Sequence, residues 1–256
     1  MIELYHWEPV SHSLRVLICL NEIGVEYKST YVDLLEFDQF ADDILTKNRT
    51  GQVPILENNG VTMCESALIT EYLAETFPDA GLASTDPLGW YNTQTWSKYV
   101  DYNLSPSLAT LGCQKYLAPL LKRRASTALR QRVDSIPVVQ RRSGWRMAIS
   151  GEYPAELLTN SERKVGLVVG RMEGILEQSD WLVGNGYSIA DINTMPFIHG
   201  LRDVAPNIIN AGNAPNTEAW HERIVARPAV KKALAKGTKF EPGTVYAPGP
   251  EHSRWG

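Results

Sequence analysis

Two groups of residues in the first third of the chain are of types, and at spacings, that could do chemistry. The first is Val53-Pro54, which opens an apolar run ahead of the turn Asn58-Asn59-Gly60. If that peptide bond is cis, the backbone of Val53 faces outward and can pair with an extended peptide ligand. The second is Glu65-Ser66, where apolar residues begin to recur at helical spacing. A helix that begins there offers free N–H groups and a positive dipole end to a carboxylate, so the two groups together predict a site for a small peptide.

The elements that must position these residues follow from the hydrophobic pattern. Strands are expected where apolar residues alternate or where β-branched and aromatic residues gather, and helices where the apolar spacing is near ~3.6 residues. The pattern predicts, in chain order, a strand over 2–7, a helix over 14–23, a strand over 25–32, a loop and helix over 35–47, strands over 53–56 and 61–63, and a helix over 66–77. This order, β-α-β-α-β-β-α, is typical of a thioredoxin-like domain, which we assign to residues 1–78.

The remainder of the chain is predicted to be almost entirely helical. Residues 79–87 are rich in turn formers and indicate a linker. A helical domain is expected over 88–240, although residues 136–153 have weak periodicity and are expected to be irregular or partly helical. The Pro- and Gly-rich residues 241–256 are expected to form a flexible tail.

Two motifs resemble those of a known family. GQVPIL at 51–56 followed by ESALITEYL at 65–73 resembles the glutathione-binding signature of the glutathione S-transferase superfamily. SIAD at 188–191 resembles the capping box in the buried C-terminal helix of these enzymes, in which the serine caps N–H groups and the aspartate reaches back. The resemblance implies the glutathione transferase architecture, an α/β thioredoxin-like N-terminal domain plus an all-α C-terminal domain. It also implies an enzyme that takes glutathione as co-substrate and forms a homodimer. The five histidines show no metal-ligand spacing, so no metal is expected.

Further stretches are similar to one branch of that superfamily, the bacterial glutathione-dependent β-etherases of lignin catabolism. They are LYHWEPVSHSL at 4–14, IPVVQRRSGWRMAISGEYPAELL at 136–158 and ERKVGLVVGRMEGILEQSDWLVGNGYSIADI at 162–192. This similarity implies cleavage of β-aryl ether bonds in lignin-derived aromatic ketones, with thiolate attack at the β-carbon releasing a phenol and a glutathione thioether. Two alternatives stay open: a general glutathione S-transferase for hydrophobic electrophiles, and a non-catalytic glutathione-binding regulatory protein.

The chemistry of this family needs a thiolate. A thiol titrates near pH ~8.5, and lowering its pKa by about two units takes roughly 2.7 kcal/mol of anion stabilisation. A hydroxyl donor at the N-terminus of the first helix could supply it, and Ser11 and Ser13 flank His12 there. Val10 occupies the position where serine-type relatives keep this hydroxyl, so similarity to the β-etherases favours Ser13, with Ser11 second. Both serines could instead be helix caps, and His12 is expected to be an exposed residue of the capping loop.

The resemblance also assigns the glutathione contacts. Glu65 and Ser66 would hold the γ-glutamyl end, and the backbone of Val53 would pair with the cysteinyl unit. Gln39 and Gln52 could hydrogen-bond the main chain or the glycyl end of the ligand. For Glu65 and Ser66, capping of the helix is an alternative role that is compatible with ligand binding.

A second, apolar cleft must hold the aromatic substrate. The helical domain offers candidate lining residues, which are Trp90, Trp96, Tyr99, Tyr116, Trp145 and Tyr153. The basic stretch Arg141-Arg142, with Arg146, could stabilise a phenolate leaving group.

Composition limits the remaining choices. The chain has 256 residues, 43% hydrophobic and 21% charged, and a net charge of −4, which gives no reason to expect a nucleic-acid partner. The N-terminus lacks a signal-peptide layout and no apolar run reaches membrane-span length, so no membrane association is expected. The cysteines, Cys19, Cys64 and Cys113, are scattered and odd in number, which favours a reducing, cytoplasmic location.

Overall fold

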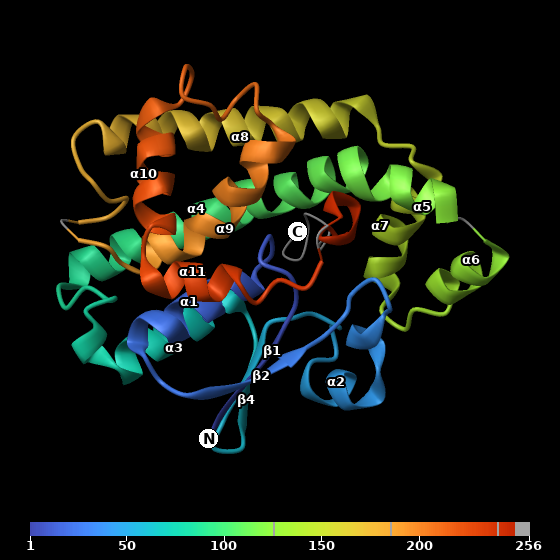
Figure 1. The fold of residues 1–256 in the computed structure, drawn as a ribbon, viewed down its shortest axis with the longest axis horizontal. Coiled ribbons are helices and arrows are strands. Elements are labelled where there is room, and N and C mark those ends of the chain that lie inside the picture. The colour runs from blue at the N-terminus through green and yellow to red at the C-terminus, as the bar shows by residue number, and fades with distance from the viewer. Residues whose placement is uncertain (125, 185, 240, 249–256) are drawn as a thin grey trace.

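The chain folds into a small sheet covered by helices. The computed structural model describes residues 1–124, 126–184, 186–239 and 241–248 (Figure 1). The strands are β1 (Ile2–His6), β2 (Tyr27–Tyr31), β3 (Ile55–Asn58) and β4 (Val61–Met63), in the order β2-β1-β3-β4. Strand β1 is parallel to β2, because helix α1 (Ser13–Ile23) forms the crossover between them, and antiparallel to β3. Asn59 and Gly60 turn the β3–β4 hairpin with positive φ, at 50° and 82°. The predicted thioredoxin-like arrangement is confirmed.

The two faces of the sheet are covered very unequally. Helices α1 and α3 (Ser66–Thr76) pack together, and with Leu4 and Leu56 they join the large core of the molecule. Alternate strand residues point the other way, since side chains of a strand alternate between faces. There Tyr5 and Ile55 form a small separate cluster with Val32 and with Ile44 of the short helix α2 (Asp42–Lys47).

The rest of the described chain is helical, as predicted. The helices are α4 (Pro87–Gly112), α5 (Ala118–Arg124), α6 (Thr127–Asp134), α7 (Val139–Ser150), α8 (Ala155–Leu176), α9 (Ile189–Val204), α10 (Pro215–Val225) and α11 (Pro228–Leu234). A π-helical turn, Cys113–Leu117, joins α4 to α5. The weakly periodic residues 136–153 contain α7, and the burial of Trp145 and Ala148 on it explains why they form a helix despite their polar neighbours.

Helix α9 lies at the centre of the helical domain and is buried along most of its length. The predicted capping box starts it: the amide of Ala190 donates to Ser188 Oγ at 3.2 Å, and the amide of Ser188 donates to Asp191 Oδ2 at 3.1 Å. Asp191 also accepts the indole N–H of Trp220 at 2.8 Å. Burial raises the pKa of Asp191 to about 6. The motif therefore joins the start of α9 to α10 as well as capping it.

The prediction of a flexible tail from residue 241 was wrong for its first residues. Residues 241–248 pack against the helical domain with a 3₁₀ turn over Pro242–Thr244, and Tyr246 is 4% exposed. The apolar ring of Tyr246 gains burial that the Pro and Gly content of the segment did not indicate. Residues 249–256 of the predicted tail lie outside the described residues. Among the residues that the structure describes, no helix combines the length and apolarity that a membrane span requires.

Candidate functional site

A cavity lies between the thioredoxin-like part and the helical domain. It encloses about 790 Å³, including the part open to solvent. Its walls come from the β1–α1 turn, the segment around residues 39–53, helices α4, α7 and α9, and residues 245–248. The Val53-Pro54 peptide bond is cis, and Val53 is among the lining residues. The cavity therefore brings one of the two predicted groups together with the helical domain.

The second predicted group, Glu65-Ser66, lies beside the cavity without lining it. Glu65 is exposed and has a positive φ of 70°, and Ser66 begins α3 with its side chain buried. The Ser66 hydroxyl accepts a hydrogen bond from Arg15 Nη1 at 3.1 Å and lies 3.0 Å from His12 Nδ1. His12 lines the cavity, so it connects Ser66 to it.

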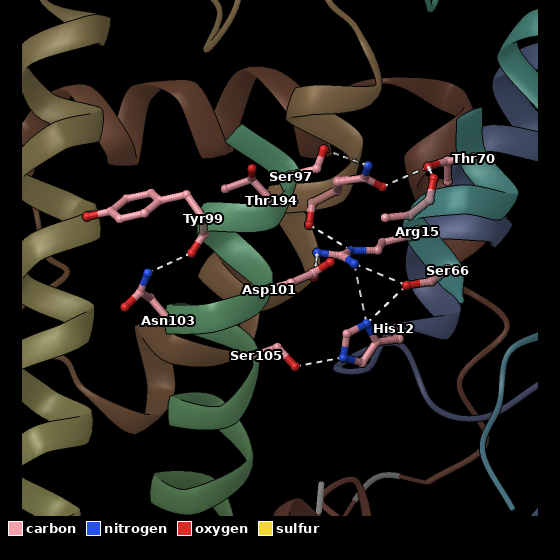
Figure 2. A network of polar contacts seen from close by, with 12 residues as sticks. His12, Arg15, Ser66, Thr70, Ser97, Tyr99, Asp101, Asn103, Ser105 and Thr194 are labelled. Atoms are coloured by element: carbon pink, nitrogen blue, oxygen red, sulfur yellow. Dashed lines mark hydrogen bonds and ion pairs between the residues drawn. The ribbon is translucent and has the colours of Figure 1, made fainter. Parts of the chain in front are cut away.

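His12 was predicted to be exposed, and the prediction was wrong. Helix α4 packs over the start of α1, and His12 Nε2 lies 2.6 Å from Ser105 Oγ of that helix (Figure 2). Arg15 Nη1, which can only donate, lies 3.4 Å from His12 Nδ1, so Nδ1 is the acceptor nitrogen. The tautomer that fits carries its proton on Nε2 and donates it to Ser105. The contact was missed because Ser105 lies far along the chain from residue 12.

A buried arginine, also missed from the sequence, organises the network in Figure 2. Arg15 is fully buried; Nη2 lies 2.6 Å from Asp101 Oδ1 of α4, and Nε donates to the carbonyl of Asn193 of α9 at 2.8 Å. Its guanidinium also lies over the ring of Phe197, 4.5 Å from the centroid. One signal was available: Arg15 is the charged residue within the apolar run LRVLICL, a position where an unpaired charge would be costly.

The network extends beyond Arg15 along α9. Thr70 of α3 donates to the side-chain oxygen of Asn193 at 3.0 Å, and the amide of Asn193 donates to Ser97 of α4 at 3.1 Å. These contacts fix α3, which carries Ser66, against both α4 and α9. The helical domain therefore positions the start of α3, where the carboxylate of a ligand is predicted to bind.

The two candidate serines differ in their access to the cavity. Ser13, the residue favoured from similarity, is fully buried, does not line the cavity and accepts the backbone N–H of Trp7 at 3.0 Å. Its hydroxyl therefore holds the β1–α1 turn and does not reach the cavity, which favours Ser11 over Ser13 for the role that similarity assigned to Ser13. Ser11 and Val10 both line the cavity. The Ser11 hydroxyl donates to the carbonyl of Glu8 at 2.6 Å.

Two buried polar atoms at the cavity wall have no hydrogen-bond partner among the described residues. They are the side-chain oxygen of Gln39 and the indole nitrogen of Trp7, in side chains that are 4% and 3% exposed. Buried polar groups are nearly always paired, so orphaned ones beside a cavity suit a polar ligand. Gln52 also lines the cavity. A peptide such as glutathione, which carries both donors and acceptors, fits these residues.

The aromatic lining differs from the predicted set. Of the six candidates only Trp145 lines the cavity. Trp90 is exposed, whereas Trp96 is buried and donates to Thr194 at 2.8 Å. Tyr99, Tyr116 and Tyr153 are partly buried elsewhere. The aromatic residues that line it without having been predicted are Trp7, Phe40, Phe197 and Tyr246.

One residue of the predicted basic stretch reaches the cavity. Arg141 lines it and is 7% exposed. Arg142 donates instead to the carbonyl of Ile136 at 2.6 Å, and Arg146 pairs with Asp134 at 2.7 Å on the surface. Helical spacing separates them, because residues one apart on α7 point in different directions.

The described residues that line the cavity include no cysteine. Cys19 and Cys113 are buried, and burial raises the pKa of the Cys64 thiol. A nucleophilic thiolate at this site therefore has to come from a ligand. Within the described ranges, no group of three or more His, Cys, Asp or Glu residues is arranged to hold a metal ion.

Comparisons with known proteins agree on one family. Residues 4–81 match the family model described as "Glutathione S-transferase, N-terminal domain", and residues 100–228 match "Glutathione S-transferase, C-terminal domain". Protein LigF of Sphingobium sp. (strain NBRC 103272 / SYK-6) is 32% identical over 244 residues, which cover 93% of this chain and 95% of that protein. Glutathione S-transferase F13 of Arabidopsis thaliana is 26% identical over 252 residues, covering 96% and 98%.

Solved structures of the same family superpose on this chain. The crystal structure of beta-etherase LigF from Sphingobium sp. strain SYK-6 superposes with a TM-score of 0.85 at 33% identity, covering 92% of this chain and 99% of that chain. Glutathione transferase F7 from Populus trichocarpa superposes with a TM-score of 0.71 at 27% identity, covering 94% and 100%. Both likenesses extend over the two domains.

Proposed function

Because this chain belongs to the glutathione S-transferase family and is an enzyme of that type, we propose that it uses glutathione to cleave β-aryl ether bonds in lignin-derived aromatic ketones. The relative whose structure is named as a beta-etherase supports this choice among the activities of the family. One observation carries the proposal. A single cavity combines candidates for glutathione contact, Ser11, Gln52 and Val53, with an aromatic wall and the buried Arg141.

Glutathione would lie with its γ-glutamyl end at the start of α3. The ammonium group of that end suits the exposed carboxylate of Glu65, and its carboxylate suits the N–H groups of the helix and the Ser66 hydroxyl. Arg15 and His12 hold Ser66 in place through the contacts described above. The cysteinyl unit would pair with the backbone of Val53, and Gln39 and Gln52 would contact the rest of the main chain.

The thiolate contact belongs to Ser11 in this proposal. Ser11 lines the cavity at the N-terminus of α1, where the helix dipole also favours an anion. A hydroxyl rotates to suit its partner, so it can turn from the Glu8 carbonyl to the sulfur when glutathione binds. The thiol proton leaves to solvent as the thiolate forms.

The reaction is a displacement at carbon. The thiolate attacks the β-carbon from the face opposite the aryloxide, the new C–S bond forms as the C–O bond breaks, and the configuration inverts. The leaving aryloxide carries the electron pair and becomes a phenol on protonation by water. The Arg141 guanidinium would stabilise the developing phenolate charge in an apolar wall where such charge is poorly solvated. The adjacent ketone would accelerate the displacement.

The test is to mix the protein with glutathione and a racemic ketone-form guaiacyl β-aryl ether, and to follow guaiacol and both enantiomers by chromatography. Release of guaiacol together with a glutathione thioether is the expected result. Cleavage that stops with one enantiomer left would indicate a handed pocket. If no ether is cleaved while a generic aryl halide is conjugated, the general transferase is the better description. Retention on immobilised glutathione without turnover of any electrophile would favour a non-catalytic binding protein.

We also propose that the protein is a cytoplasmic homodimer. Large apolar side chains are exposed on β4, α3 and α4, and a dimer interface would remove them from water. They are Val61, Leu68, Leu88, Trp90, Tyr91 and Tyr102. Sedimentation equilibrium tests the dimer, and a monomer mass at micromolar concentration would contradict it.

A further inference from the structure

The end of the described chain forms a strap that crosses from one domain to the other. We use "strap" for residues 238–248, of which the structure describes 238–239 and 241–248. At its start, the amide and hydroxyl of Thr238 donate to the buried carboxylate of Glu8, at 3.1 and 2.6 Å. Farther along, Thr244 and Tyr246 are buried against the helical domain. The strap is therefore attached to both domains.

The ring of Tyr246 is seated in a site on the helical domain that is shaped to hold it. The ring stacks on Tyr116, with centroids 5.6 Å apart and 12° between the planes. A Cβ atom at Gly112 would lie 2.3 Å from the Tyr246 ring. Gly112 has ordinary helical angles, φ −66° and ψ −43°, so its backbone conformation does not require glycine. The position is glycine because the Tyr246 ring occupies the space that a side chain would need. Likewise, a Cβ at Gly144 would lie 2.9 Å from Pro248.

The seated strap is a wall of the cavity. Residues 245–248 line it together with Leu108 of α4 and Trp145 of α7. Tyr246 thus packs on Tyr116 on one side and lines the cavity on another. A ring held in this way has little freedom to move, so it defines the shape of the space that a substrate can occupy.

We propose that Tyr246 is a specificity-determining residue for the second substrate. Its ring closes the electrophile part of the cavity to a width that holds flat aromatic groups, and its removal leaves a space in which an aromatic ether is bound loosely. This inference rests on the proposed function, because it takes the electrophile to bind in the same cavity as glutathione. It adds that the strap, which lies outside the residues matched by either family model, selects for aromatic substrates.

The experiment compares a large and a small electrophile in three variants. Tyr246→Ala removes the ring, Gly112→Ala displaces it while leaving it in the chain, and Tyr246→Phe is the matched control. Alanine is a better helix former than glycine, so α4 tolerates the second change. Steady-state kinetics are measured with the guaiacyl ketone ether and with a small alkyl halide, which has too few atoms to reach the strap. Calorimetry measures glutathione affinity.

The expected result is a KM for the ether raised about 10-fold in Tyr246→Ala and Gly112→Ala, the scale of one lost aromatic contact. The KM for the alkyl halide and the glutathione Kd should stay within about twofold, and Tyr246→Phe should match the wild type. Equal losses for both electrophiles, or an unchanged ether KM, overturn the inference. If the wild type cleaves no ether but conjugates an aryl halide, the proposed substrate fails, and the aryl halide becomes the large substrate under the same criterion. If no electrophile reacts, both proposals fail.

Discussion

Replacing Arg15 with methionine should destabilise the protein far more than replacing an arginine in a surface ion pair. Methionine keeps most of the aliphatic stem and removes the guanidinium. The change takes from the carbonyl of Asn193 and the hydroxyl of Ser66 their Arg15 donors at 2.8 and 3.1 Å, and leaves the Ser66 hydroxyl its contact with His12. Each buried polar group that loses its partner costs about 1–3 kcal/mol. Asp101 loses its partner too: its side chain is 35% exposed as a whole, but the Oδ1 atom that faces Arg15 is buried and has no other hydrogen-bond partner among the described residues.

We therefore expect the free energy of unfolding to fall by about 3–5 kcal/mol, the usual effect of breaking a buried pair. For a chain of this size that corresponds to a melting temperature lower by roughly 6–20 °C. Urea unfolding, followed by tryptophan fluorescence, gives the midpoint and slope from which the change is obtained.

Arg146 provides the matched control. Its ion pair with Asp134 spans 2.7 Å, against 2.6 Å for Arg15 and Asp101, but its two side chains are 61% and 59% exposed. Arg146→Met should cost at most about 1 kcal/mol, because solvent screens the pair. Equal and small losses in the two variants would refute the reasoning, since burial would then not decide the strength of the contact. The double variant Arg15→Met with Asp101→Leu should recover part of the loss.

Three other predictions test the site and the core. Ser11→Ala should lower turnover by roughly 10- to 100-fold, through loss of about 1.4–2.7 kcal/mol of thiolate stabilisation. Ser13→Ala should mainly lower the stability of the fold. If thiolate absorbance titrations respond to Ser13→Ala and not to Ser11→Ala, the thiolate contact belongs to Ser13. Glu65→Gln should weaken glutathione binding by about 1.5 kcal/mol or more in calorimetry, and an unchanged Kd would remove Glu65 from the site. Burial lowers the pKa of His199, and burial with His199 nearby lowers that of His221 to about 3. The unfolded chain therefore binds more protons, so the free energy of unfolding should fall as pH drops below about 6.5. His221→Gln should flatten this dependence, and a slope that stays the same would contradict it.

The thioredoxin-like half could be predicted because its signals are local. Asn59 and Gly60 form a hairpin turn because both residues accept positive φ readily, and the start of a helix at Ser66 follows from the apolar spacing after it. Contacts between distant segments leave no such signal. Nothing near His12 indicates that Ser105 of α4 will lie 2.6 Å away.

The candidate site shows the same limit. Ser11 and Ser13 are two residues apart at a helix start, and only the turn geometry decides which one faces the cavity. The aromatic wall was missed for a related reason. Tyr246 follows a Pro- and Gly-rich segment, and its burial depends on glycine at position 112 of another element. Arg15 was also missed, although a charged side chain inside an apolar run already indicates a buried partner.

The small cluster behind the sheet has a consequence for ligand affinity. Helix α2 is joined to the strands through Ile44, its buried residue, and through a cluster far smaller than the main core. Such a segment opens locally at low free-energy cost, well before the whole chain unfolds, and its amides should exchange hydrogen early. Gln39 and Phe40, just before α2, line the cavity. Glutathione would thus bind the closed form of a local opening equilibrium, and its apparent affinity would scale with the closed fraction. Shortening the side chain of Ile44, which does not line the cavity, would then weaken glutathione binding without removing a contact to the ligand.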